Sequence, residues 1–261
     1  MNLLKTKTYI CNWLTKYANN NNKIFIVGIS GGIDSALTST LCAETEIKTI
    51  IVSMPIKQNK DQLVRAQEHA KWLETKYKNV EKLEINLDYL FNAFQKTMPQ
   101  KIQNEIGLIN TKARLRMTTL YQIASAQNGI VVGTGNKIED FGVGFFTKYG
   151  DGGVDISPIA DLTKTEVKKI ALNLNIIESI IKADPTDGLW ENNRTDEDQL
   201  GAKYSELEWA MHYRENNMHG KENLSKKEIK ILSIYDDNHK KNKHKMTTIP
   251  ICKIPENLKN E

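Results

Sequence analysis

The stretch of this sequence best suited to chemistry is residues 28–35, Gly-Ile-Ser-Gly-Gly-Ile-Asp-Ser. It follows an apolar run at residues 24–27 that is typical of a buried parallel strand, and it precedes residues 36–41, which favour a helix. Glycines in such a turn bring backbone N–H groups close to a ligand, and the positive end of the helix dipole points at the same place. The pattern predicts a phosphate-binding loop.

The side chains of this loop fit the same chemistry. Ser30 and Ser35 supply hydroxyl donors, and the carboxylate of Asp34 is compatible with bound phosphate if a Mg²⁺ ion lies between them. The alternative is an ordinary glycine turn in which Asp34 and Ser35 only cap the helix. The position between a strand and a helix favours the phosphate loop, and the absence of a following Gly-Lys-Ser/Thr excludes a Walker loop.

The string at residues 30–35 resembles the signature of the ATP pyrophosphatases, enzymes that cleave ATP between its α and β phosphates to adenylate a substrate oxygen. Other strings resemble the ammonia-dependent NAD synthetase family. In chain order they are residues 112–117, 133–134 with Glu139, 146–151, 161–164, 184–186, 196–197 and 244–245. The resemblance therefore covers nearly the whole chain, and other ATP pyrophosphatases lack the Thr-Lys-Tyr-Gly-Asp and His-Lys strings.

This resemblance implies a ligase of NAD biosynthesis with ATP as co-substrate and Mg²⁺ as cofactor. The carboxylate of deamido-NAD would attack the α-phosphorus of ATP, and ammonia would convert the acyl-adenylate to NAD with release of AMP. The family's ATP-binding positions correspond here to Gly28, Ile29, Ser30, Gly31, Gly32, Ile33, Asp34, Ser35, Thr134, Lys164 and Thr186. Its metal ligands correspond to Asp34 and Glu139, and carboxylate oxygens suit a hard cation.

The resemblance also implies sites for the second substrate and for proton transfer. Deamido-NAD would bind to Arg114, Lys148, Asp155, His244 and Lys245, and the catalytic positions would be Asp151, Asp196 and Glu197. Asp151 is the candidate for orienting or deprotonating ammonium, although a cap on the turn at residues 152–153 explains it equally well. Because the spacing from Glu139 to Lys148 leaves the register open by one residue, Asp140 is the alternative metal ligand.

The elements that must position these residues follow from hydrophobic periodicity. Apolar runs predict strands at residues 24–27, 48–54, 80–85 and 129–133, and helical spacing predicts intervening helices, including a long one over residues 110–128. This alternation indicates an α/β fold with a doubly wound parallel sheet and helices on both faces. Ligands of such sheets bind beyond the carboxyl ends of the strands. The resemblance implies the adenine nucleotide alpha-hydrolase-like version, with residues 1–261 as a single NAD synthetase domain.

The C-terminal third is predicted to be mainly helical. Capping boxes at Thr163-x-x-Glu166 and Ser225-x-x-Glu228 indicate the starts of two helices. Between them, residues 183–199 are acidic and contain few aliphatic side chains, so we expect a lid that substrates order. The basic run at residues 238–245 is typical of a solvated helix end.

Composition restricts the class of protein only broadly. The 261 residues carry a net charge of +4, which suits a polyanionic small substrate as well as RNA. Three isolated cysteines indicate neither a disulfide framework nor a metal site and fit a reducing compartment. Because no signal-peptide pattern and no apolar run of ~18 residues is present, we expect a cytoplasmic enzyme without membrane or nucleic-acid partners.

Two other functions remain open at this stage. A tRNA-modifying ATP pyrophosphatase would use the basic residues 240–245, but thiolating enzymes need cysteines at other spacings. A non-catalytic nucleotide-binding module would leave Glu139 and Lys164 without a role. We expect a homodimer, because the resembled family is dimeric and places deamido-NAD between subunits. Ammonia, free or delivered by a separate protein, is the expected nitrogen donor because no glutaminase segment is recognised.

Overall fold

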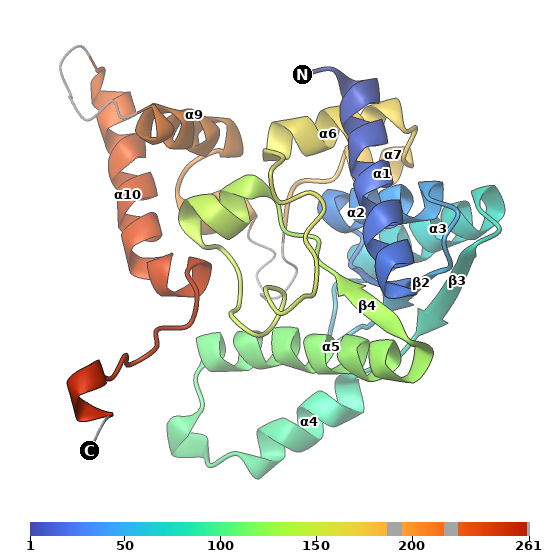
Figure 1. Cartoon of the computed structure of the whole chain (residues 1–261), viewed down its shortest axis with the longest axis horizontal. Coiled ribbons are helices and arrows are strands. Elements are labelled where there is room, and N and C mark those ends of the chain that lie inside the picture. Colours follow the sequence, from blue (N-terminus) through green and yellow to red (C-terminus); the bar gives the residue numbers. More distant parts are fainter. Residues whose placement is uncertain (187–194, 217–223, 260–261) are drawn as a thin grey trace.

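The computed structural model describes residues 1–186, 195–216 and 224–259 (Figure 1). Its strands form a parallel sheet in the order β3-β2-β1-β4. The strands are β1 (Ile24–Ile29), β2 (Thr49–Ser53), β3 (Val80–Glu84) and β4 (Gly129–Val132). Val27 of β1 lies beside Ile51 of β2 and Val132 of β4. The predicted α/β fold with its parallel sheet is confirmed.

Helices cover both faces of the sheet. They are α1 (Leu3–Asn21), α2 (Ile33–Glu44), α3 (Lys60–Lys76), α4 (Asp88–Thr97), α5 (Glu105–Gln127), α6 (Lys164–Asn173) and α7 (Glu178–Ile181). Helix α5 begins five residues before the predicted start at residue 110, because the side chain of Asn104 accepts a hydrogen bond from the N–H of Gly107 at 2.7 Å and caps the helix there. A short 3₁₀ turn, η1 (Gln100–Ile102), separates α4 from α5.

Side chains of β1 alternate between two apolar layers. Phe25 and Val27 are buried with residues of α1, α2 and α6 on one face. Ile26 points to the opposite face, where it is buried with residues of α4 and α5 such as Phe91 and Ala124. Because this central strand is covered on both sides, its sequence is apolar almost throughout, as parallel strands of this kind require. Residues 28–35 therefore begin at the end of a strand that is fixed in the core.

Helices of the C-terminal part form a further apolar cluster beside the sheet. They are α8 (Asp196–Leu200), α9 (Tyr204–Glu215) and α10 (Lys226–Met246), and the short, exposed η3 (Glu256–Leu258) contributes no residue to it. Helices α9 and α10 pack on a single π-helical turn, η2 (Ile138–Val143), through the buried Leu207 and Leu232 (Figure 1). The carboxylate of Glu208 accepts from the N–H and the hydroxyl of Thr165 at 2.8 and 2.7 Å, and this joins α9 to α6.

The predicted signals of the C-terminal third have mixed outcomes. Both capping boxes are present, at Thr163 with Glu166 and at Ser225 with Glu228. The basic run ends α10, as predicted. Of the predicted lid, residues 187–194 lie outside the described residues, so its closure stays a prediction. Within the described ranges, no helix has both the length and the apolar character needed to cross a membrane.

Candidate active site

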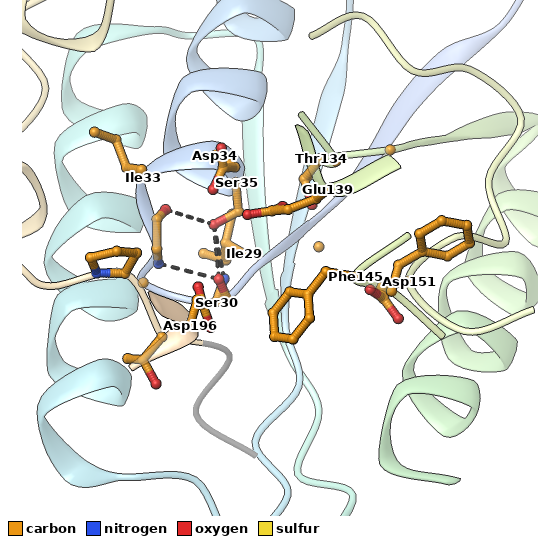
Figure 2. Close-up of a pocket in the computed structure, with 18 of the residues that line it drawn as sticks. Ile29, Ser30, Ile33, Asp34, Ser35, Thr134, Glu139, Phe145, Asp151 and Asp196 are labelled. Carbon is orange, nitrogen blue, oxygen red and sulfur yellow. Dashed lines mark hydrogen bonds between the residues drawn. The ribbon is translucent and has the colours of Figure 1, made fainter. Parts of the chain in front are cut away.

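The turn between β1 and α2 requires a glycine at position 31. Gly31 has a φ of +84°, and a Cβ at that position would collide with the carbonyl oxygen of Gln62. Ser35 Oγ accepts from the N–H of Ser30 at 3.2 Å and donates to the carbonyl of Gly32 at 3.0 Å (Figure 2). The serine hydroxyls thus hold the turn from inside. The first N–H groups of α2 have no acceptor within the helix and line a cavity there.

This cavity has a volume of about 480 Å³ and lies beyond the carboxyl ends of β1 and β4. It brings together most of the predicted site residues. Those lining it are Gly28, Ile29, Ser30, Gly31, Gly32, Ile33, Asp34, Ser35, Thr134, Glu139, Asp151, Lys164, Thr186, Asp196 and Glu197. The prediction that these segments converge at one edge of the sheet agrees with the structure.

A lysine between two carboxylates forms the charged centre of the cavity. Lys164 Nζ lies 2.5 Å from Asp34 Oδ2 and 3.1 Å from Glu139 Oε1. All three side chains are largely buried, with exposed fractions of 12%, 16% and 14%. Burial alone would lower the pKa of Lys164, but the charges of Asp34 and Glu139 outweigh it and raise that pKa. Lys164 is therefore a permanent cation at the phosphate loop.

A buried amide that was not predicted from the sequence contacts the Asp34 carboxylate and the backbone at Glu139. Asn136 is fully buried. Its Nδ2 donates to Asp34 Oδ1 at 3.2 Å, and its Oδ1 accepts from the N–H groups of Ile138 and Glu139 at 3.1 and 3.2 Å. One side chain thus sets the start of η2 and the position of Asp34. The available signal was an Asn two and three residues before the N–H groups it accepts from, a common local pattern for this residue type.

Asp34 and Glu139 could together hold a divalent cation. Both carboxylates contact the ammonium of Lys164. Mg²⁺ is commonly bound by one or two carboxylates together with substrate phosphates. Among the described residues no group of three or more acidic, His or Cys side chains is arranged to hold a metal ion. The donor set therefore fits a cation that arrives with a phosphate ligand rather than one caged by protein alone.

Asp140, the alternative ligand, lies in a different environment. Its carboxylate lies directly against Gly135, where a Cβ would collide with it. Burial, with the charges of Glu139 and Asp151, raises the pKa of Asp140 to about 8. It is Glu139 that contacts Lys164 next to Asp34, so the geometry favours Glu139 as the ligand.

Asp151 lies in the cavity wall opposite the loop (Figure 2). Its Oδ1 accepts from the N–H of Thr147 at 2.9 Å. The residue is exposed and lines the cavity, and desolvation nonetheless raises the pKa of its carboxylate against the effect of its backbone hydrogen bonds. A carboxylate with a raised pKa in contact with the cavity suits a proton acceptor, and the hydrogen bond to residue 147 equally suits a turn cap.

The residues predicted to bind the second substrate lie outside the cavity lining and contact other parts of the chain. Lys148 Nζ donates to the carbonyl of His244 at 2.8 Å. Lys245 Nζ donates to two carbonyls of the segment 144–146, each at 2.8 Å. These lysines attach the end of α10 to the wall of the cavity.

The other two members of that set have similar contacts. Arg114 Nη2 donates to the carbonyl of Lys148 at 3.4 Å. Asp155 accepts from the hydroxyl of Tyr121 at 2.9 Å and from the N–H of Val131 at 2.8 Å. Their role in binding a ligand stays a prediction.

Three further residues of the cavity were missed at the sequence level. Gln62 Nε2 donates to the carbonyl of Thr186 at 3.3 Å, and Arg65 Nε donates to the carbonyl of Gly31 at 3.3 Å. Tyr204 contacts Glu139 through its hydroxyl. Each contact joins segments far apart in the chain, and none of the three residues belongs to a local motif.

Comparisons of the sequence with known proteins point to one family. The model of the NAD synthase family matches residues 6–249. The NH(3)-dependent NAD(+) synthetase of Carboxydothermus hydrogenoformans is 40% identical over 206 residues, which are 76% of this chain and 81% of that protein.

Two solved structures superpose on nearly the whole chain. NMN synthetase from Francisella tularensis superposes with a TM-score of 0.83 at 29% identity over 98% of this chain and 99% of the other. NH3-dependent NAD synthetase from Campylobacter jejuni, solved with a nitrate ion, gives a TM-score of 0.79 at 27% identity over 97% and 100%.

The cation site yields a test with two neighbouring carboxylates. We expect Glu139→Gln to weaken Mn²⁺ binding in the presence of ATP by roughly tenfold or more, because it removes a charged ligand. Asp140→Asn, the matched control with the same acid-to-amide substitution one residue away, should leave the affinity near that of the wild type. Electron paramagnetic resonance of Mn²⁺ measures both, and melting curves report folding. If only Asp140→Asn weakens binding, the ligand is Asp140.

Proposed function

The chain belongs to the NAD synthase family, and we propose that its cavity carries out the reaction of the family's ammonia-dependent members. The chain catalyses the ATP-dependent amidation of deamido-NAD by ammonia, which yields NAD, AMP and pyrophosphate. The observation that carries this assignment is the phosphate loop at residues 28–35 with Lys164 placed between Asp34 and Glu139. A non-catalytic nucleotide-binding module has no need of that charged centre.

In the proposed first step the chain positions two anions against each other. A carboxylate is a poor acyl donor until one of its oxygens becomes part of a good leaving group, so its oxygen attacks the α-phosphorus and pyrophosphate departs. The N–H groups at the start of α2 and the ammonium of Lys164 stabilise the charge that develops on the departing phosphates. Mg²⁺, held by Asp34 and Glu139, would supply further positive charge there.

In the second step ammonium must lose a proton before its nitrogen can attack, and the nitrogen loses another as the amide forms. We assign the first proton to the carboxylate of Asp151, whose pKa is raised by desolvation and which lines the same cavity. The nitrogen forms a bond to the acyl carbon, the bond from that carbon to the AMP oxygen breaks, and AMP leaves. Asp196 and Glu197 close the cavity on the side of Thr186 and support the residues that bind phosphate.

Two more general features belong to this proposal. Residues 1–261 act as one domain, since the ties from Glu208 to Thr165 connect the C-terminal helices to the sheet layer. The enzyme works in the cytoplasm, where reducing conditions suit its three unpaired cysteines.

A second candidate substrate comes from the structural comparison. One of the well-superposed structures is an NMN synthetase, and an amidating enzyme of that kind acts on the corresponding mononucleotide acid. The cavity described above holds the ATP loop and the carboxylate-activating centre, which both substrates would use in the same way. The two substrates differ in the adenylate half, which only deamido-NAD carries.

Product analysis with both acids tests the function. The protein is incubated with ATP, Mg²⁺ and ammonium, together with deamido-NAD or with nicotinate mononucleotide. We expect AMP, pyrophosphate and NAD, with a higher kcat/KM for deamido-NAD. ADP and phosphate as products would contradict an ATP pyrophosphatase, and a higher kcat/KM for the mononucleotide would transfer the function to NMN synthesis.

We also propose a homodimer. The residues predicted to bind deamido-NAD lie outside the ATP cavity, so a dinucleotide needs further walls. Around the junction of α4 and α5 several large apolar side chains are exposed, which is typical of an interface. They are Tyr89, Leu90, Phe94, Ile102 and Ile106.

Light scattering tests the dimer directly. We expect twice the chain mass of 29.7 kDa at assay concentration. Ile106→Asp should shift the protein toward the monomer and lower activity, whereas Leu172→Asp, at an exposed apolar residue of α6, should do neither. A fully active monomer would refute the dimer.

A further inference from the structure

Tyr204, the first residue of α9, is buried against the charged centre. Its hydroxyl lies 2.5 Å from Glu139 Oε1 and 3.3 Å from Asp196 Oδ2. Both neighbours are carboxylates, which in the ionised form accept hydrogen bonds and have none to give to the hydroxyl. It therefore acts as a donor, and the shorter contact goes to Glu139.

The contact orients the carboxylate of Glu139. Tyr204 and Lys164 both donate to Oε1, at 2.5 and 3.1 Å, so neither occupies the other oxygen, Oε2. Two donors on one oxygen fix the rotation of the carboxylate plane. The ring of Tyr204 also lies 4.7 Å from Lys164 Nζ, measured to the ring centroid, a distance at which the ring face attracts a cation.

Tyr204 is itself held by the segment that precedes it. Its backbone N–H donates to Glu197 Oε1 at 2.9 Å. In the residue before Glu197, the N–H of Asp196 donates to the carbonyl of Pro185 at 3.0 Å, and Pro185 precedes the predicted phosphate contact Thr186. The start of α9 is therefore bonded to α8, and α8 is bonded to the segment that ends at Thr186. These bonds hold the Tyr204 hydroxyl in place, as a precise positioning group requires.

We propose that Tyr204 is a positioning residue, whose hydrogen bond to Glu139 sets that carboxylate for the Mg²⁺ that accompanies ATP. The inference rests on the proposed function, in which Glu139 is a metal ligand. Groups that hydrogen-bond a ligating carboxylate influence metal affinity and activity nearly as strongly as some ligands do. Through this bond, α8 and α9 contribute to the phosphate site without touching the reacting atoms.

The test is Tyr204→Phe, which keeps the ring next to Lys164 and removes only the hydroxyl. Mn²⁺ binding is measured by electron paramagnetic resonance in the complex with an ATP analogue that has a methylene bridge between its α and β phosphorus atoms. We expect the Mn²⁺ affinity to fall by roughly tenfold or more. Turnover should fall at low Mg²⁺ and recover at high Mg²⁺, with the KM for deamido-NAD unchanged.

Tyr235→Phe is the matched control. Tyr235 is a buried tyrosine of α10 in the same apolar cluster, and its loss of a hydroxyl leaves Glu139 untouched. It should bind Mn²⁺ and turn over like the wild type, and melting curves show whether either variant loses folded protein.

Wild-type Mn²⁺ affinity in Tyr204→Phe, or a loss of turnover that high Mg²⁺ does not restore, would overturn the proposal and leave Tyr204 a packing residue. Failure of the function itself is separate, because it would appear as absence of NAD from the wild-type protein.

Discussion

Two carboxylates and one ammonium group set the conditions that the rest of the site meets. Asp34 follows β1, Glu139 follows β4, and both are largely buried, so their charges could not lie side by side without a cation. Lys164 supplies it from a position 130 residues after Asp34. Removing one partner from a buried ion pair costs about 3–5 kcal/mol. Helix α6, which carries Lys164, is held in place by the capping box at Thr163 and by the hydrogen bonds from Thr165 to Glu208.

The same arrangement accounts for the chemistry. Adenylation brings a carboxylate and a triphosphate together, and the reaction slows unless fixed positive groups face the charge that moves. The chain provides Lys164 and the start of α2, while Asn136 contacts the Asp34 carboxylate and Tyr204 contacts that of Glu139. The sheet layer therefore supplies the turn that carries Asp34, and the C-terminal helices supply Tyr204, which contacts Glu139.

Local patterns in the sequence predicted the sheet, the strand-to-helix turn at residues 28–35 and both capping boxes, because each depends on neighbouring residues. The start of α5 was misplaced because a single cap at Asn104 extended the helix beyond its apolar periodicity. Tyr204 and the contact of Asn136 with Asp34 were not predicted, because these hydrogen bonds join distant segments. The charges of Lys148 and Lys245 were visible, but only the structure places them on backbone carbonyls. Long-range polar contacts of this kind have no periodic signature.

The central claim is that the site joins the carboxylate oxygen of deamido-NAD to the α-phosphorus of ATP. Deamido-NAD labelled with ¹⁸O in its nicotinate carboxylate, incubated with ATP, Mg²⁺ and ammonium, tests it directly by mass spectrometry of the products. We expect the AMP formed to carry one ¹⁸O atom and the pyrophosphate to carry none. Unlabelled AMP, or label in phosphate or pyrophosphate, would contradict it.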